Sequence, residues 1–177
     1  VRCGDHFLRP LLQRWYEASR ELAPNLQLQG LEQVGDLVVQ TDPRALMLAL
    51  DQLLDNACQH AYRSMPIQLS LAWSDGLDHC ILEFASQSLD APVASEDLEG
   101  WSGPFFRGKP ERDGERVEGP CLGLALAREL VRGCGGTLEL HQKPSSEGTT
   151  TIVRLRLKVR TSNGSGAVAA AVRTDPA

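Results

Sequence analysis

Hydrophobic side chains recur every three to four residues in three parts of the chain, a period that places them on one face of a helix. The three segments are 7–22, 43–61 and 122–133. The middle segment has the clearest start, because Asp42 suits the N-cap position and Pro43 the first helical position. Its apolar face comprises Leu46, Leu50, Leu53, Leu54, Ala57 and Ala61. We therefore predict three amphipathic helices.

Alternation of apolar and polar residues predicts strands at 67–73, 80–86, 137–142 and 150–158. The first two strands are joined by a turn at Asp75 and Gly76, so we expect them to pair antiparallel. Two shorter runs, 26–30 and 37–41, are bounded by turn residues, and we expect them to form a hairpin. The mixture of helices and strands predicts an α/β domain.

Two segments lack any hydrophobic period. Residues 87–121 are interrupted by many glycines and prolines, and a loop of this length inside a compact domain is usually functional or mobile. Residues 161–177 are rich in Gly, Ser and Ala without aromatic residues, so we expect a disordered tail. The sequence thus predicts one domain over residues 1–160.

Composition narrows the classes of function. The chain has 177 residues, 42% of them hydrophobic, which is enough for one core. Its net charge of −5 argues against a nucleic-acid partner, since phosphate binding needs a basic surface. No apolar run reaches the roughly 18 residues of a membrane-spanning helix. The cysteines are scattered along the chain and odd in number, so we expect them to be unpaired, small and buried apolar residues in a reducing cytosol. They are Cys3, Cys58, Cys80, Cys121 and Cys134.

The helix predicted at 43–61 carries a polar stripe. Gln52, Asn56 and Gln59 are spaced i, i+4 and i+7, so they share one face, and Asp55 and His60 lie beside them. The carbonyl oxygen of an asparagine side chain is a suitable ligand for Mg²⁺. We expect the stripe to overlook a cleft, with Asn56 as the metal ligand. The alternative is a polar helix face that only contacts water.

A turn that contains glycine, residues 119–124, leads directly into the helix predicted at 122–133. Unpaired N–H groups at a helix N-terminus, together with the helix dipole, favour a bound phosphate. Gly123 would let the backbone approach such a ligand closely. The alternative is a glycine and proline that only mark the start of a helix.

In combination, these segments resemble a known superfamily. Residues 52–61 resemble the N box of the histidine kinase, gyrase, Hsp90 and MutL ATPases. Residues 104–108, preceded by 96–99, resemble the F box of histidine kinases, and residues 119–124 resemble their G2 box. Residues 135–140 and 148–157 are similar to the two closing strands. The resemblance covers roughly residues 7–158 in the family's order.

The resemblance implies a two-layer α/β sandwich, the Bergerat fold, in which a mixed and mainly antiparallel sheet packs on helices. ATP with Mg²⁺ would lie between the N-box helix and a lid over about residues 87–121. Asn56 corresponds to the Mg²⁺ ligand, and Gln52 and Arg107 to catalytic positions near the phosphates. The nucleotide contacts implied by the family are Asp55, Asn56, Gln59, His60, Gln87, Phe106, Gly119, Leu122, Gly123 and Leu124.

The segment that should supply an adenine-binding Asp and its glycines departs from the family, because residues 86–92 contain no glycine. Alignment from the preceding strand places Gln87 at the Asp position, and alignment backwards from Glu96 places Ser88 there. We choose Gln87, whose amide oxygen can accept the hydrogen bond. Asp90 is a less favoured substitute. Cys121 also replaces the central glycine of the G2 box.

The resemblance leaves two functions open. One is the catalytic domain of a bacterial two-component sensor kinase, which donates the γ-phosphoryl group of ATP to a histidine outside this chain, for transfer to a response regulator. The other is a degenerate relative that binds ATP weakly or not at all and docks a partner. A hydrolysing relative is disfavoured, because Gln52 lacks the carboxylate of a general base.

The acceptor histidine is expected on a separate helical hairpin. His6 only superficially echoes the acceptor motif, since the acid and the threonine are missing and no hairpin can intervene before the N box. The resemblance further implies a homodimeric parent kinase and a cytoplasmic location for this domain, while the parent protein can be anchored in the membrane.

Overall fold

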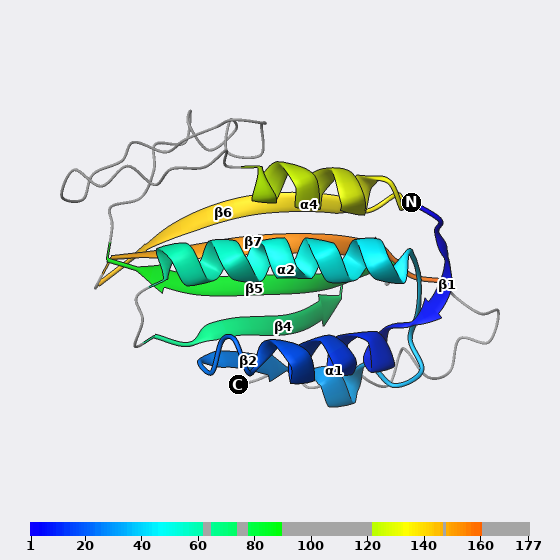
Figure 1. Cartoon of the computed structure of the whole chain (residues 1–177), viewed down its shortest axis with the longest axis horizontal. Coiled ribbons are helices and arrows are strands. Elements are labelled where there is room, and N and C mark those ends of the chain that lie inside the picture. The colour runs from blue at the N-terminus through cyan, green and yellow to red at the C-terminus, as the bar shows by residue number, and fades with distance from the viewer. Residues whose placement is uncertain (62–64, 74–77, 90–121, 147, 161–177) are drawn as a thin grey trace.

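The computed structural model describes residues 1–61, 65–73, 78–89, 122–146 and 148–160. It has two layers, with three helices covering one face of a five-stranded sheet (Figure 1). The helices are α1 (Leu8–Ser19), α2 (Pro43–His60) and α4 (Gly123–Arg132). The predicted α/β sandwich is therefore confirmed.

The sheet has the strand order β2-β4-β5-β7-β6. Its strands are β2 (Leu26–Gln29), β4 (Ile67–Trp73), β5 (His79–Ser88), β6 (Thr137–Ser145) and β7 (Gly148–Lys158). Only β2 and β4 are parallel, and every other neighbouring pair is antiparallel. A second sheet of two strands, β1 (Gly4–Phe7) and β3 (Val38–Thr41), lies near the N-terminus.

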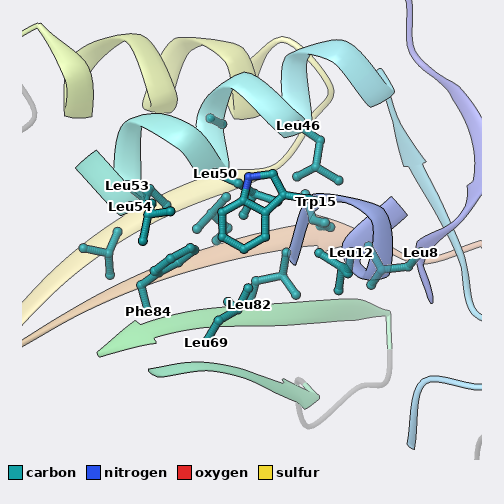
Figure 2. Packing of buried hydrophobic residues seen from close by; sticks show 14 of the residues in the cluster. Leu8, Leu12, Trp15, Leu46, Leu50, Leu53, Leu54, Leu69, Leu82 and Phe84 are labelled. Atoms are coloured by element: carbon teal, nitrogen blue, oxygen red, sulfur yellow. The ribbon is translucent and has the colours of Figure 1, made fainter. Parts of the chain in front are cut away.

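The core lies between α2 and the centre of the sheet. Side chains on one face of β5 and β7 are buried against the apolar face of α2. Trp15 of α1 joins this cluster, where its ring meets the ring of Phe84 edge to face at a centroid distance of 5.9 Å (Figure 2). The indole Nε1 of Trp15 donates a hydrogen bond of 2.8 Å to Oδ1 of Asp51, which fixes α1 against α2.

The opposite face of the sheet is polar. Arg154 of β7 and Glu83 of β5 form an ion pair of 2.7 Å across this face. Glu139 of β6 lies 3.4 Å from Arg156 and 3.5 Å from His141. The sheet thus has an apolar side under the helices and a charged side that faces away from them.

The predicted hairpin of residues 26–30 and 37–41 is wrong. The left-handed backbone of Gly30, with φ of 80°, leads into a short 3₁₀ helix, η1 (Leu31–Gln33), which carries the chain away from β2. As a result β2 pairs parallel with β4, and β3 pairs with β1, a strand that the sequence pattern did not reveal. Leu22, expected on the first helix, lies beyond its end and is 87% exposed.

The expectation for the cysteines is only partly correct. Cys3 and Cys134 form a disulfide with a Cα–Cα distance of 5.6 Å, and Cys58 is exposed. Cys80 is buried as expected, and burial raises the pKa of its thiol to about 12. Cys121 lies outside the described residues. The pairing was missed because nothing in the sequence brings residues 3 and 134 together.

The remaining elements agree with the sequence pattern, with longer strands. The second predicted helix, the pairing of β4 with β5, and the two closing strands are confirmed. β5 extends to Ser88, so the first part of the expected loop belongs to a strand. Residues 90–121 and 161–177 lie outside the described part of the chain. Within the described ranges, no helix is both long and apolar enough to cross a membrane.

Candidate functional site

The helix that carries the polar stripe, α2, is fixed at its start and along its length. Oδ1 of Asp42 accepts hydrogen bonds from the backbone N–H groups of Arg44 and Ala45, at 3.0 and 3.3 Å. Oδ2 of Asp42 accepts from the N–H of Arg2 at 2.6 Å, and this bond is the main reason why the pKa of Asp42 is lowered. The apolar side of α2 packs on the sheet, and Asp51 is hydrogen-bonded to Trp15 of α1. Together these contacts fix the orientation of the helix about its own axis.

The stripe itself runs from half-buried to exposed positions. Gln52 and Asn56 are half-buried, and Asp55, Gln59 and His60 are exposed. Between Ala45 and His60 this helix has no lysine or arginine. A phosphate near the stripe would therefore need a cation from elsewhere, and Mg²⁺ held by an amide oxygen would supply that charge.

Gln52 marks the place where α2 meets α4. A Cβ atom added to Gly123, the first residue of α4, would lie 3.1 Å from Oε1 of Gln52. The two helices lie side by side on the sheet (Figure 1). The structure therefore brings the N-box segment and the start of the G2-box helix into contact, as the sequence order alone could not show.

The start of α4 presents backbone donors. Leu122 is the N-cap residue and makes no side-chain capping hydrogen bond, so the first-turn N–H groups, including those of Gly123 and Leu124, are not capped by it. Leu122 is itself exposed. Such donors, together with the helix dipole, suit an anionic ligand beside Gln52.

The end of β5 forms the other border of the region. Side chains alternate between the two faces of a strand. Phe84 faces the helices, so Ser86 and Ser88 share its face, whereas Gln87 shares the charged face of Glu83. Gln87, which was chosen as the adenine-binding residue, is thus on the side of the sheet away from α2. Strand alternation, applied to the sequence, would have revealed this.

Gly148 holds the end of β5 in place. It has a φ of 140°, and a Cβ atom added to it would lie 2.1 Å from the carbonyl oxygen of Ser88 and 2.9 Å from Cα of Leu89. Only glycine permits this approach between the start of β7 and the end of β5. This contact could not be predicted from the pattern of alternation, because Gly148 lies two residues before the strand predicted at 150–158.

Cys58, on α2 next to the stripe, is exposed. Partial burial raises the pKa of its thiol, and the negative charge of Asp55 raises it further. The other expected site residues, Phe106, Arg107 and Gly119, lie outside the described residues.

Comparison with known proteins identifies related chains. The family described as histidine kinase-, DNA gyrase B-, and HSP90-like ATPase matches residues 41–161. The chain is similar to histidine protein kinase DivJ of Caulobacter vibrioides, with 29% identity over 130 residues, 73% of this chain and 21% of DivJ. It is also similar to sensor protein kinase CarS of Pseudomonas aeruginosa, with 29% identity over 121 residues, 68% of this chain and 24% of CarS.

The fold is similar to that of a mycobacterial sensor histidine kinase, MprB. The TM-score is 0.66 at 19% identity, over 90% of this chain and 100% of the MprB chain. The chain spans about a fifth to a quarter of the length of the two curated relatives.

Proposed function

Because the chain belongs to the family of histidine kinase-, DNA gyrase B- and HSP90-like ATPases, we propose that it binds ATP with Mg²⁺ and donates the γ-phosphoryl group to a histidine outside residues 1–177. The observation that carries this proposal is the contact between Gln52 of α2 and Gly123 of α4. It sets a half-buried polar stripe beside helix N-terminal donors, which is an arrangement suited to a metal-bound polyphosphate.

In this proposal, each part of the site has a role. The side-chain oxygen of Asn56 would hold Mg²⁺, which would supply positive charge beside the stripe, where α2 has no lysine or arginine between Ala45 and His60. Gln52 orients the phosphate end of the nucleotide against the first turn of α4, where the backbone of Leu122, Gly123 and Leu124 donates to phosphate oxygens. Asp55, Gln59 and His60 border the nucleotide on the exposed side. Catalysis then consists mainly of positioning and neutralisation of charge.

We assign three further roles from the family resemblance alone. Phe106 anchors the loop over the nucleotide, Arg107 contacts phosphate, and Gly119 begins the turn into α4. All three lie in the segment that the structure does not describe.

We propose Ser88, in place of Gln87, as the side chain that accepts a hydrogen bond from the adenine amino group. Ser88 lies at the end of β5 on the face of the sheet that carries the helices, and a hydroxyl oxygen can accept such a bond. A neutral acceptor binds less strongly than a carboxylate, so we expect modest affinity. Replacement of Ser88 by Ala should weaken binding, and replacement of Gln87 by Ala should leave it unchanged.

The test is a calorimetric titration of the chain with a non-hydrolysable ATP analogue, with and without Mg²⁺. We expect saturable binding that depends on Mg²⁺ and is lost in Asn56→Ala. The control is Gln13→Ala, which removes an exposed polar side chain that belongs to α1 and hydrogen-bonds Glu17 of the same helix. Absence of binding at millimolar analogue in a folded sample would refute the proposal and favour a module that docks a partner without nucleotide.

We further propose that the acceptor histidine lies on a helical hairpin of a longer, homodimeric kinase that works in the cytoplasm and transfers the phosphoryl group to a response regulator. Support comes from DivJ and CarS, which are named as kinases and are four to five times longer than the matched region. A longer chain that includes such a hairpin should label itself with phosphate from ATP, and the Asn56→Ala version should not.

A further inference from the structure

Three distant parts of the chain meet at one point, close to the start of α2. The disulfide between Cys3 and Cys134 joins the N-terminal segment to the second residue after the C-terminal end of α4. The backbone N–H of Arg2 donates to the side chain of Asp42, which caps α2. The backbone N–H of Asp42 donates in turn to Sγ of Cys134, at 3.2 Å.

The two cysteines differ in exposure. Cys3 is an exposed residue of the N-terminal segment, whereas Cys134 is only 7% exposed. This difference favours attack of a dissolved thiolate at Cys3, with Cys134 as the leaving group. This order of events favours exchange, because the attacked sulfur belongs to the exposed Cys3. The leaving sulfur belongs to Cys134, which already accepts a hydrogen bond from the N–H of Asp42.

Both sulfur atoms also have a polar partner after reduction. The N–H of Asp42 remains beside Cys134 and stabilises the thiolate that leaves. The carbonyl oxygen of Gly133 lies 3.5 Å from Sγ of Cys3, and a reduced Cys3 thiol there would donate to it. The junction therefore accommodates the bonded and the reduced pair without burying an unpaired polar group.

We propose that Cys3 and Cys134 form a reversible thiol–disulfide site, whose reactants are small thiols and their disulfides. In the reducing direction, a thiolate attacks Sγ of Cys3, and the mixed disulfide forms as Cys134 leaves with the electron pair and takes up a proton. A second thiolate attacks the mixed disulfide, and Cys3 leaves as a thiol. Two thiols are oxidised to one disulfide, and the protein disulfide gains two electrons and two protons.

The consequence of reduction is local. In the oxidised form the N-terminal segment is held to the turn after α4 by a covalent bond. In the reduced form noncovalent contacts hold it, among them the pairing of β1 with β3, the ion pair between Asp5 and Arg160, and the hydrogen bond from Arg2 to Asp42. Because Asp42 caps α2 and also binds the N-terminal segment, a change in the redox state of the cysteines alters the contacts at the start of the helix that carries the polar stripe. In a reducing compartment Cys3 and Cys134 are both thiols, and oxidation forms the disulfide between them.

The other described cysteines provide internal comparisons. Cys58 is exposed but the structure places no second cysteine beside it in the described part of the chain. Cys80 is buried with its pKa raised to about 12, so it stays protonated and reacts slowly. Only Cys3 and Cys134 should therefore change together.

The test equilibrates the 177-residue chain in mixtures of reduced and oxidised glutathione, quenches it with acid, and alkylates the free thiols for peptide mass spectrometry. Cys3 and Cys134 should become protected together, over one two-electron transition. Hydrogen exchange is measured on the same samples, at amides of β1 and of residues 133–136. We expect exchange there to be roughly tenfold faster or more in the reduced form, because local opening is less restricted.

Two variants complete the design. Cys3→Ser, at an exposed position, should remove the protection of Cys134 and make exchange independent of the redox buffer. Cys58→Ser should retain the full response. Independent titration of the two cysteines, stable mixed disulfides with glutathione in place of the pair, or equal exchange in both forms would each overturn the proposal. The readouts need no nucleotide, so they do not depend on the proposed function.

Discussion

Replacement of Gly148 by Ala tests how the structure positions the end of β5. The added Cβ atom would lie 2.1 Å from the carbonyl oxygen of Ser88, well inside contact distance, and the φ of 140° is unfavourable for alanine. The backbone term costs about 1–3 kcal/mol. Overpacking against a rigid backbone adds about 1–3 kcal/mol. We therefore expect a total loss of about 2–6 kcal/mol.

Gly135→Ala is the matched control. Gly135 also has a positive φ, of 73°, at the turn after α4, but a Cβ atom added there meets nothing within 4 Å. Alanine at this position therefore incurs only the backbone cost, about 1–2 kcal/mol. The difference between the two variants isolates the contact of residue 148 with the end of β5.

The assay is urea unfolding of both variants and the wild type in one redox buffer, so that the disulfide state is constant. For a domain of this size, the expected loss lowers the midpoint of thermal unfolding by about 10 °C. In urea, the midpoint should fall while the slope stays constant. If Gly148→Ala proves no more destabilising than Gly135→Ala, the close approach to Ser88 is absent in solution and the reasoning fails.

Three further outcomes are expected. Asp42→Asn should lower the urea midpoint at neutral pH. Since the folded pKa of Asp42 is lowered, its stabilising contribution is present above the unfolded value near 4 and is lost as the pH falls through the folded pKa, so the two proteins should converge in acid. Trp15→Phe removes the donor to Asp51 and should cost about 1–2 kcal/mol in urea unfolding, with little additional loss when Asp51→Ala is combined with it. Gly123→Ala should raise the Kd for an ATP analogue several-fold in calorimetry without lowering the unfolding midpoint, because its Cβ displaces only the flexible side chain of Gln52; an unchanged Kd would separate Gly123 from the site.

Helices and strands whose formation is encoded within their own residues could be predicted from local signals in the sequence. The N-cap Asp42 and the apolar spacing that follows it predicted α2, because capping and amphipathicity are encoded within the helix. The alternation in 67–73 and 80–86 predicted β4 and β5 for the same reason. The resemblance to the ATPase family, which the match to residues 41–161 confirms, did not by itself predict the contact between α2 and α4, which the structure shows.

Features that depend on distant partners were not predictable in this way. Two short extended runs separated by a few residues resemble a hairpin, yet β2 found a parallel partner in β4 and β3 found β1. The disulfide joins residues that are 131 positions apart in the sequence. The side of the sheet on which Gln87 lies was predictable from the alternation of the strand. The two possible alignments of this segment differ by one residue, and a shift of one residue moves a side chain to the other face of a strand.

The ladder between β5 and β7 has a consequence for how this chain can change. All ten residues of β5 pair with β7, although residues 89–147 separate the two strands along the chain. The entropy of closing such a connection grows slowly with its length, by about 0.6 kcal/mol for each doubling. A change in the length of the connection between β5 and β7 therefore alters the closure entropy of this ladder only slightly. The register of the two strands can be the same in chains whose connections differ in length.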